Sequence, residues 1–240
     1  MYHRVLLKLS GEALKEDGAD SIFNVAQIEE LSKTIADMHK NGFQIAIVIG
    51  AGNIWRGKLA STVGIDPVPA DFMGMLGTVI NAVALSSNLK NKFGVEGVVY
   101  SAVPAIEGVS VTYNEKDALK SLEEGKIVFC AGGTGKPFFT TDTGAALRAK
   151  ELKCDAILMG KHGVDGIYTS DPLSNKDAKF IKNITYNEII NKNLKVMDKS
   201  AAEILKDTNI KIRVFSMKNP NSFLKVAQGD GMGSFVEKGE

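Results

Sequence analysis

Short apolar runs of strand length alternate with segments of helical periodicity along most of the chain. The runs at 4–9, 43–49, 97–102 and 126–133 consist largely of Val, Ile, Leu and other apolar residues. Strands that are apolar over nearly their whole length are typical of a parallel sheet covered on both faces. The alternation therefore predicts an α/β fold, a three-layer α/β/α sandwich with a mainly parallel central sheet.

The segments between these runs carry helix signals. Asn24 and Gln27 have the spacing of a capping box, and Gly42 follows the last residue of the apolar stripe that they open. The segment 68–92 predicts a long helix, and its part at 72–85 is apolar nearly all round. Helices of that kind are buried in a core or in a subunit interface.

The pattern loosens in the last third of the chain. Residues 174–183 are polar and predict a surface loop, while 235–238 predict a strand that closes an edge of the sheet. The sequence contains no internal repeat, low-complexity tract or Ser/Pro-rich linker. We therefore expect a single domain over residues 1–240.

Composition excludes several function classes. Lys plus Arg number 29 and Asp plus Glu number 28, so the net charge of +1 leaves no excess for a nucleic-acid backbone. The N-terminal segment has neither the pattern of a signal peptide nor that of a membrane span. Cys130 and Cys154 lie in apolar runs without ligand spacing, which predicts buried thiols in a reducing compartment. A cytoplasmic protein that binds neither nucleic acid nor membrane is expected.

Glycine-rich segments follow several of the predicted strands. They read KLSG at 8–11, GAGN at 50–53, AGGTGKP at 131–137 and MGKHG at 159–163. The carboxyl ends of parallel strands meet at one edge of a sheet, and glycines there let backbone N–H groups approach a ligand. Four such segments at one edge predict phosphate or nucleotide binding.

The two most familiar phosphate motifs do not fit. Pro137 stands where a P-loop requires Ser or Thr after Gly135 and Lys136. The dinucleotide pattern that begins at Gly50 ends on Trp55, although Asp71 at about the expected spacing leaves an NAD-binding alternative open.

Nucleophilic hydrolysis and metal catalysis find no support in the sequence. His3, His39 and His162 lack metal-ligand spacing, and no G-x-S-x-G motif is present. The remaining cationic and amide groups suit phosphoryl transfer, in which positioning and charge stabilisation dominate.

Longer motifs identify a resemblance over essentially the whole chain. KLSGEAL, IGAGNIWRG, DFMGMLGTVINA, TGKPFFTTD, VDGIYTSDP and KVMD, which begin at residues 8, 49, 71, 134, 164 and 195, resemble the bacterial UMP kinases of the amino-acid-kinase fold family. The Lys-x-Ser-Gly opening at 8–11 and the glycine-rich loop at 50–53 are shared widely in that fold family. The segments at 55–57, 71–74 and above all 134–142 are more specific to its UMP kinases.

The resemblance implies roles for individual residues. The implied catalytic residues are Lys8, Arg56, Asp142 and Asp198, the last of unspecified role. The implied ATP contacts are Lys8, Leu9, Ser10, Gly11, Gly52, Arg56, His162, Tyr168 and Asp171. The implied UMP contacts are Ala51, Asp71, Thr134, Gly135, Lys136, Pro137, Phe138, Phe139, Thr140 and Thr141. Ala51 stands where the family often has Gly, and His162 where it commonly has Thr or Asn.

The resemblance also implies a reaction and an assembly. ATP and UMP would give ADP and UDP, with Mg²⁺ carried by ATP rather than held in a protein metal site. The UMP side would lie mainly in 1–150 and the ATP side mainly in 151–240. A homohexamer built from dimers is implied. Because the attacking phosphate oxygen is ionised near neutral pH, no general base is needed.

Alternatives remain for the function of the chain and for the roles of single residues. The chain could be another enzyme of this fold that phosphorylates a carboxylate or carbamate, but the segment 134–142 argues against this reaction. It could also be a non-enzymatic uridylate sensor, but the presence of Lys8 and Asp142 argues against that role. Locally, Asp71 and Asp142 could serve only as helix caps. Trp55, Tyr168, Phe138 and Phe139 could serve only in packing.

Overall fold

The chain forms two compact units, which we describe in turn. The computed structural model describes residues 2–15, 21–161, 163–192, 194, 196–217, 219 and 221–239. One unit comprises Leu9–Thr141, and the other combines Met1–Lys8 with Asp142–Glu240. We call them the central unit and the terminal unit. The chain passes between them at residues 8–9 and 141–142, where no linker-like sequence occurs.

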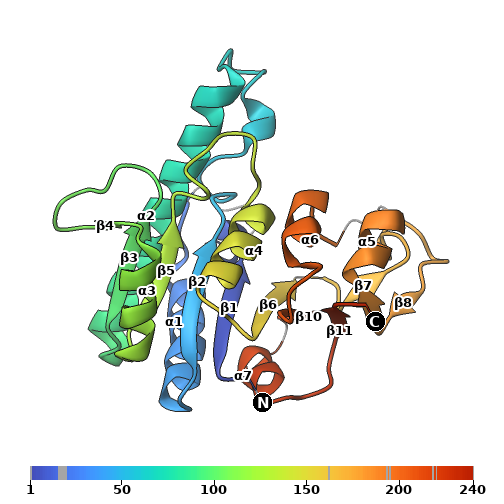
Figure 1. The fold of residues 1–240 in the computed structure, drawn as a ribbon. Helices are drawn as coiled ribbons and strands as arrows, with labels where there is room; N and C mark the ends of the chain where they lie inside the picture. The colour runs from blue at the N-terminus through green and yellow to red at the C-terminus, as the bar shows by residue number, and fades with distance from the viewer. Residues whose placement is uncertain are drawn as a thin grey trace. The chain divides into compact units, whose positions relative to one another are not determined.

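The central unit has parallel strands in the order β4-β3-β5-β2 (Figure 1). Their bounds are β2 (Gln44–Ile49), β3 (Gly97–Ser101), β4 (Val111–Thr112) and β5 (Ile127–Ala131). Its helices are α1 (Val25–Lys40), α2 (Pro67–Phe93) and α3 (Glu115–Glu123), with short 3-10 turns η1 (Gly11–Leu14) and η2 (Gly57–Leu59). Strand β5 is buried over its whole length, as its apolar sequence predicts.

The terminal unit has strands in the order β1-β6-β10-β11-β9. The strands are β1 (Arg4–Leu9), β6 (Ala156–Lys161), β9 (Asn183–Thr185), β10 (Lys211–Ser216) and β11 (Ser234–Glu237), and a separate hairpin pairs β7 (Ile167–Tyr168) with β8 (Phe180–Ile181). Its helices are α4 (Thr141–Glu151), α5 (Tyr186–Lys192), α6 (Lys199–Leu205) and α7 (Ser222–Ala227). Strands β1, β6 and β10 run parallel, whereas β11 is antiparallel to β10 and β9 runs parallel to β11. The predicted α/β class with a mainly parallel sheet is confirmed.

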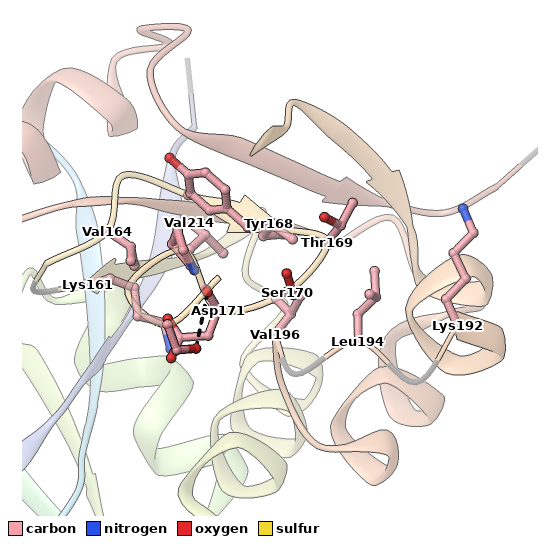
Figure 2. A pocket seen from close by; sticks show the side chains of 14 residues that line it. Lys161, Val164, Tyr168, Thr169, Ser170, Asp171, Lys192, Leu194, Val196 and Val214 are labelled. Atoms are coloured by element: carbon pink, nitrogen blue, oxygen red, sulfur yellow. Dashed lines mark hydrogen bonds between the residues drawn. The ribbon is translucent and has the colours of Figure 1, made fainter. Parts of the chain in front are cut away.

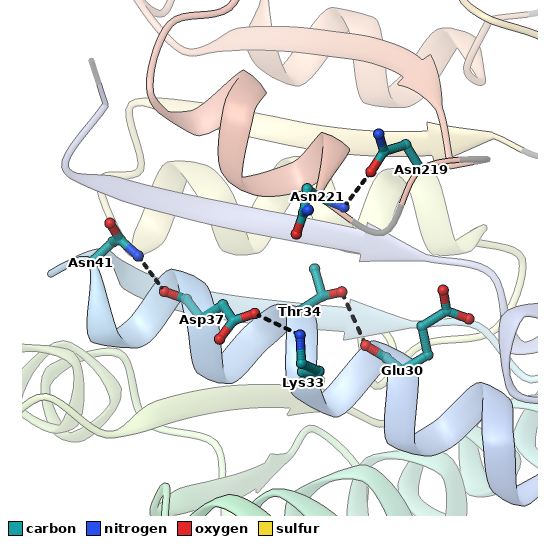
Figure 3. Close-up of polar contacts among 7 residues, drawn as sticks. All are labelled: Glu30, Lys33, Thr34, Asp37, Asn41, Asn219 and Asn221. Atoms are coloured by element: carbon teal, nitrogen blue, oxygen red, sulfur yellow. Dashed lines mark hydrogen bonds and ion pairs between the residues drawn. The ribbon is translucent and has the colours of Figure 1, made fainter.

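Helix α1 illustrates how local sequence sets an element. The Asn24 side chain accepts a hydrogen bond from the Gln27 backbone N–H at 3.1 Å, which confirms the predicted cap. The Asn24 N–H donates to the Leu14 carbonyl at 2.7 Å, which connects the start of the helix to the end of η1. The polar side of the helix carries the Lys33–Asp37 ion pair and the Asn41 contact to Asp37 (Figure 3).

Helix α2 is long and apolar enough to cross a membrane, by length and composition alone. It is instead a core helix of the central unit, with Ala70, Ala82, Leu85 and Leu89 fully or almost fully buried. Polar side chains on it make buried hydrogen bonds to neighbouring loops, as described below. The exposed apolar residues on this helix are Val68, Phe72, Met73, Leu76, Ile80 and Phe93.

Two expectations for the last third of the chain are wrong. The range 174–183, expected to be a loop, contains β8 and the first residue of β9. Strand β11 lies between β10 and β9, so the edge position predicted for residues 235–238 belongs to β9. These strands are two to four residues long, too short for alternation of side chains to identify them.

Candidate functional site

In the central unit, the segment after β1 packs against the loop after β2. A Cβ atom on Gly11 would lie 2.9 Å from the Gly52 nitrogen and closer still to the Gly50 carbonyl oxygen, so only glycine fits. Ser10 caps the turn η1 by accepting from the Glu12 N–H at 3.3 Å. The Leu9 carbonyl accepts from the Gly50 N–H at 2.9 Å, and its side chain is buried. The structure thus brings together the predicted residues at 9–11 and 50–52.

Buried amides on α2 fix the loop after β2. Asn81 donates to the Gly50 carbonyl at 2.8 Å and to Asn53 Oδ1 at 2.8 Å. Asn53 donates back to Asn81 Oδ1 at 3.0 Å and to the Ile22 carbonyl at 2.9 Å. Because both side chains are buried, an unpaired amide here would be costly, and the pair holds the loop in one conformation.

Helix α2 also holds the loop after β5. The Gly132 N–H donates to the Thr78 hydroxyl at 2.8 Å, and Thr78 donates to the Met75 carbonyl at 2.6 Å. Further along, Gly135 has a φ of +75°, and a Cβ there would lie 2.6 Å from the Ala102 carbonyl oxygen. Thr134 Oγ1 accepts from the Lys136 N–H at 3.2 Å, which closes a tight turn.

Asp71 lies beside this loop and does not cap its helix. Helix α2 begins at Pro67, so Asp71 is in its second turn and the alternative of a cap is wrong. Its Oδ2 accepts from the Phe138 backbone N–H at 2.6 Å. Phe138 has a φ of +67°, a left-handed conformation that costs free energy in a non-glycine residue. Asp71 therefore helps to stabilise a strained loop conformation.

The two phenylalanines of this loop are not core residues. Phe138 is 71% exposed and Phe139 is 51% exposed, so the packing interpretation is wrong for both. Thr140 is also exposed, Pro137 is half-buried, and Thr141 begins helix α4. Exposed aromatic rings held on an ordered loop are available to a ligand.

Arg56 is oriented by two acceptors in the central unit. Its guanidinium forms an ion pair with Glu12 and donates from Nε to the Gly52 carbonyl at 3.3 Å. Trp55 donates from its ring nitrogen to the Ala70 carbonyl at 2.9 Å, which favours the packing interpretation for this side chain. Ala51 is nearly buried, so its backbone is the part that a ligand could contact, as the sequence predicts.

In the terminal unit, Lys8 and Asp142 form an ion pair. Lys8 Nζ lies 2.7 Å from Asp142 Oδ1, and both side chains are about four-fifths buried. Lys8 comes from β1, and Asp142 lies in the first turn of α4. A cation and an acid predicted separately as catalytic residues are therefore in direct contact. Their burial makes the interaction stronger than a surface pair of the same length.

Asp198 has a structural partner that the sequence does not reveal. It caps α6 by accepting from the Ala201 N–H at 2.7 Å. Its two oxygens also accept from the Thr143 hydroxyl, each at 3.0 Å, and thereby connect α6 to α4. The residue that Asp198 contacts, Thr143, follows Asp142 directly in α4, and the catalytic role of Asp198 stays a prediction.

A cavity of about 680 Å³ opens within the terminal unit (Figure 2). Tyr168 and Asp171 line it, as do Val196 and Val214 on the strands and loops around them. The Tyr168 hydroxyl donates to Asp165 at 2.6 Å, and this hydrogen bond raises the pKa of Tyr168. Its ring makes an edge contact with Phe180 across the β7–β8 hairpin, with centroids 5.5 Å apart. Tyr168 thus serves in packing and is also available to the cavity.

Lys161 is a functional candidate that the motif comparison misses. It is the last residue of β6 and lines the same cavity. Burial lowers the pKa of Lys161, the charge of Lys8 lowers it further, and Asp142 opposes the shift. In the sequence, Lys161 could be found only from its position at the end of a predicted strand, within MGKHG. Its neighbour His162, predicted as an ATP contact, lies outside the described residues.

Within each unit the chemistry is that of an anion-binding site. The terminal unit offers lysine ammonium groups beside one carboxylate, and the central unit offers backbone N–H groups of glycine-rich loops. Among the residues that the structure describes, no three His, Cys, Asp or Glu side chains gather as a metal-binding group. Such sites suit phosphoryl groups, whose charge cations and amides stabilise.

Comparisons with known proteins agree with this chemistry. The sequence profile of the amino acid kinase family matches residues 3–216. The chain is 47% identical to a uridylate kinase of Mycoplasma capricolum over 237 residues, 98% of each chain. A uridylate kinase of Mesoplasma florum is 46% identical and equally well covered.

Solved structures of similar proteins give the same assignment. A UMP kinase from Bacillus anthracis, 39% identical, aligns with a TM-score of 0.95 over 100% of this chain and 97% of its own. A UMP kinase from Ureaplasma parvum, 37% identical, aligns with a TM-score of 0.91 over 99% and 100%. The chain belongs to the amino acid kinase family and, within it, to the uridylate kinases.

Proposed function

We propose that the chain transfers the γ-phosphoryl group of MgATP to the phosphate of UMP, producing UDP and ADP for pyrimidine nucleotide synthesis. The observation that carries this proposal is the identity of 46–47% over almost the whole chain with proteins named uridylate kinase. The anion-binding character of both units supports it.

The reaction places its main demand on charge stabilisation. The attacking oxygen of UMP is already ionised near neutral pH, so the site needs no general base. Lys8 stabilises charge on the transferred group, and Asp142, 2.7 Å away, orients the Lys8 ammonium. Backbone N–H groups at 50–52 and 134–135 add donors that require no reorganisation during the reaction.

UMP binds to the loops of the central unit in this proposal. The loop at 134–141 surrounds its phosphate and base, the Ala51 backbone adds a contact, and Asp71 accepts from the ribose hydroxyls. Asp71 uses Oδ2 for the Phe138 N–H, and Oδ1 can accept from the ribose without breaking that bond. Asp71 thus selects the sugar while it stabilises the loop.

ATP occupies the cavity of the terminal unit. A volume of about 680 Å³ lies within the range of cavities that bind small molecules, roughly 300–1,000 Å³. Tyr168 contacts the adenine and Asp171 the ribose. Lys8 contacts the phosphates from the same unit, and Asp198 supports the helix that carries Asp142.

Asp142 and Asp198 would be the carboxylates available in the terminal unit to a Mg²⁺ ion carried by ATP. Asp142 pairs with Lys8 and Asp198 caps α6, so both carboxylates are held in place by the protein. When bound, the ion neutralises phosphate charge and leaves the protein residues to position the nucleotide.

The protein acts as a cytoplasmic homohexamer built from dimers. The exposed apolar residues of α2 support a subunit interface, because Phe72, Met73, Leu76 and Ile80 recur at helical spacing on one side of the helix. The buried thiols of Cys130 and Cys154 fit a reducing compartment.

A substrate panel tests the proposed function. ADP release from ATP would be measured with UMP, CMP, dUMP, glutamate, aspartate and carbamate as acceptors. We expect UMP to be the best acceptor by at least tenfold in kcat/KM. Activity on an amino acid or carbamate but not on UMP would assign the chain to another reaction of this fold, and UMP binding without turnover would indicate a sensor.

A further inference from the structure

The end of strand β6 brings a second lysine to the face of the sheet that carries Lys8. In parallel strands, residues in register point to the same face, as do residues two apart along one strand. Lys8 is in register with Met159, and Lys161 lies two residues beyond Met159. Val214, in register with Met159 on the other side, lines the cavity together with Lys161. Lys8 and Lys161 therefore share this face.

The charge of Lys161 is not balanced within the protein. Among the described residues, its ammonium group has no ion pair and no hydrogen bond, although the side chain is partly buried. The one carboxylate that acts on it, Asp142, already pairs with Lys8 at 2.7 Å. Two ammonium groups thus share one acid. Withdrawing a cation from water without an ion-pair partner costs free energy, so this arrangement favours an anionic ligand.

Of the two lysines that line the cavity, only Lys161 lacks an ion pair among the described residues, because Lys192 pairs with Glu188 at 2.7 Å. Asp171 and Asp165 keep their negative charge and are held by neutral donors, the Leu173 N–H and the Tyr168 hydroxyl. Lys161 and Lys192 lie at opposite ends of the cavity in Figure 2. The lysine without an ion pair is therefore at the Lys161 end.

We infer that Lys161 binds the polyphosphate of ATP and supplies, together with Lys8, a second cation for the phosphoryl group being transferred. The inference rests on the proposed function, because it takes ATP as the occupant of the cavity. A triphosphate would provide the counter-charge that the protein does not. Lys8, tied to Asp142, gives a fixed cation, whereas Lys161 without a protein partner can follow the phosphate as it moves.

Replacement of Lys161 by methionine tests the inference. Lys161→Met keeps most of the length of the side chain and removes its charge. We expect kcat/KM for ATP to fall about 10²-fold, as for loss of one charge-stabilising donor, with the Kd for UMP within twofold of the wild type. Lys161→Arg should recover at least tenfold of that loss. Lys192→Met, at the other end of the cavity, is the matched control and should change kcat/KM for ATP less than twofold.

Nucleotide binding separates this inference from the proposed function. Calorimetry with a non-hydrolysable ATP analogue would measure the affinity of each variant whether or not UMP is the acceptor. We expect Lys161→Met to bind the analogue at least tenfold more weakly, with an unfolding midpoint no lower than that of the wild type. Wild-type affinity in a folded Lys161→Met variant would overturn the role of Lys161. Failure of the wild type to phosphorylate UMP would overturn only the proposed acceptor.

The pH dependence of the KM for ATP gives a second readout. Because burial and Lys8 lower the pKa of Lys161, it loses its proton at a lower pH than an exposed lysine does. The protonated form binds phosphate, so the KM for ATP should rise on the alkaline side of the profile. In Lys161→Arg, which stays charged, this rise should move to higher pH. An alkaline limb that is identical in the two proteins would contradict the assignment.

Discussion

Lys8 is the residue on which phosphoryl transfer depends most directly in this account. Lys8→Ala removes the cation that lies 2.7 Å from Asp142 and leaves that acid without its ion pair. We expect turnover to fall by about 10²–10³, with UMP affinity nearly unchanged, because the interaction strengthens as charge develops. Steady-state kinetics and UMP titration measure the two effects. Lys33→Ala, which removes an exposed ion pair on α1, is the control. A Lys8→Ala variant with turnover within threefold of the wild type would exclude this role.

Asp71 gives a prediction about substrate selection. A site that hydrogen-bonds a substrate hydroxyl disfavours the analogue without it, so dUMP should have a kcat/KM lower than that of UMP by about 10². Asp71→Asn keeps an oxygen acceptor for the Phe138 N–H but loses the charge. We expect Asp71→Asn to lower kcat/KM for UMP and to reduce the difference in kcat/KM between UMP and dUMP.

The control for Asp71 lies at the start of the same helix. Asp66 stands at the N-cap position of α2 and makes no side-chain cap hydrogen bond. Asp66→Asn should leave the ratio of kcat/KM for UMP to kcat/KM for dUMP unchanged. If Asp71→Asn lowered the melting temperature but kept that ratio, Asp71 would act only through the Phe138 loop.

For individual residues, the sequence predicts which side chains belong to the candidate site better than it predicts their contacts. Lys8 and Asp142 are predicted separately, and only the fold places them in contact. The left-handed Phe138 and its bond to Asp71 join positions 67 residues apart, so no local pattern reveals them. Lys161 is missed because its importance comes from an unbalanced charge, which depends on tertiary burial.

Helix α2 is the element that organises the central unit. Thr78 accepts from the Gly132 N–H, Asn81 donates to the Gly50 carbonyl, and Asp71 holds the Phe138 N–H. Spacings of seven and three residues bring these side chains to one side of the helix. A single helix therefore sets the conformation of two glycine-rich loops.

Removal of one of these contacts should affect both stability and UMP binding. Thr78→Val keeps the shape of the side chain but leaves the buried Gly132 N–H without its acceptor. We expect the free energy of unfolding to fall by about 1–3 kcal/mol and the KM for UMP to rise more than that for ATP. Urea unfolding and kinetics measure these changes. Thr78→Ser, which retains the hydroxyl, should lie close to the wild type, and equal behaviour of the Val and Ser variants would show that the hydrogen bond is dispensable.

Element boundaries follow from the sequence where caps and long apolar patterns occur. Strand β1 has the predicted bounds, and α2 extends one residue beyond its prediction at each end. The range 164–172 predicts a short strand-like segment and contains β7, whereas β8 and the first residue of β9 fall where a loop is predicted. Strand β9 pairs with β11, which is distant in the sequence, so a tertiary contact rather than a local pattern determines it.

At the scale of the whole molecule, the exposed apolar face of α2 predicts the assembly. Leu76 is 51% exposed and Ile80 is 47% exposed, one turn apart on this helix. Lysine at both positions would place charges in the proposed interface and should give a smaller species by sedimentation equilibrium. Val25→Lys, at an exposed apolar position of α1, is the control and should keep the wild-type mass. An unchanged mass for the Leu76→Lys, Ile80→Lys variant would exclude α2 from the interface.

The fate of the label in [γ-³²P]ATP shows whether this chain moves a phosphoryl group from ATP to UMP. The purified protein would be incubated with labelled ATP, Mg²⁺ and UMP, and the products would be separated by chromatography. We expect the label to appear in the β-phosphate of UDP at the rate at which ADP forms. In Lys8→Ala this rate should be lower by about 10²–10³. Label found only in inorganic phosphate, or label that remains in ATP while UMP binds, would contradict the claim.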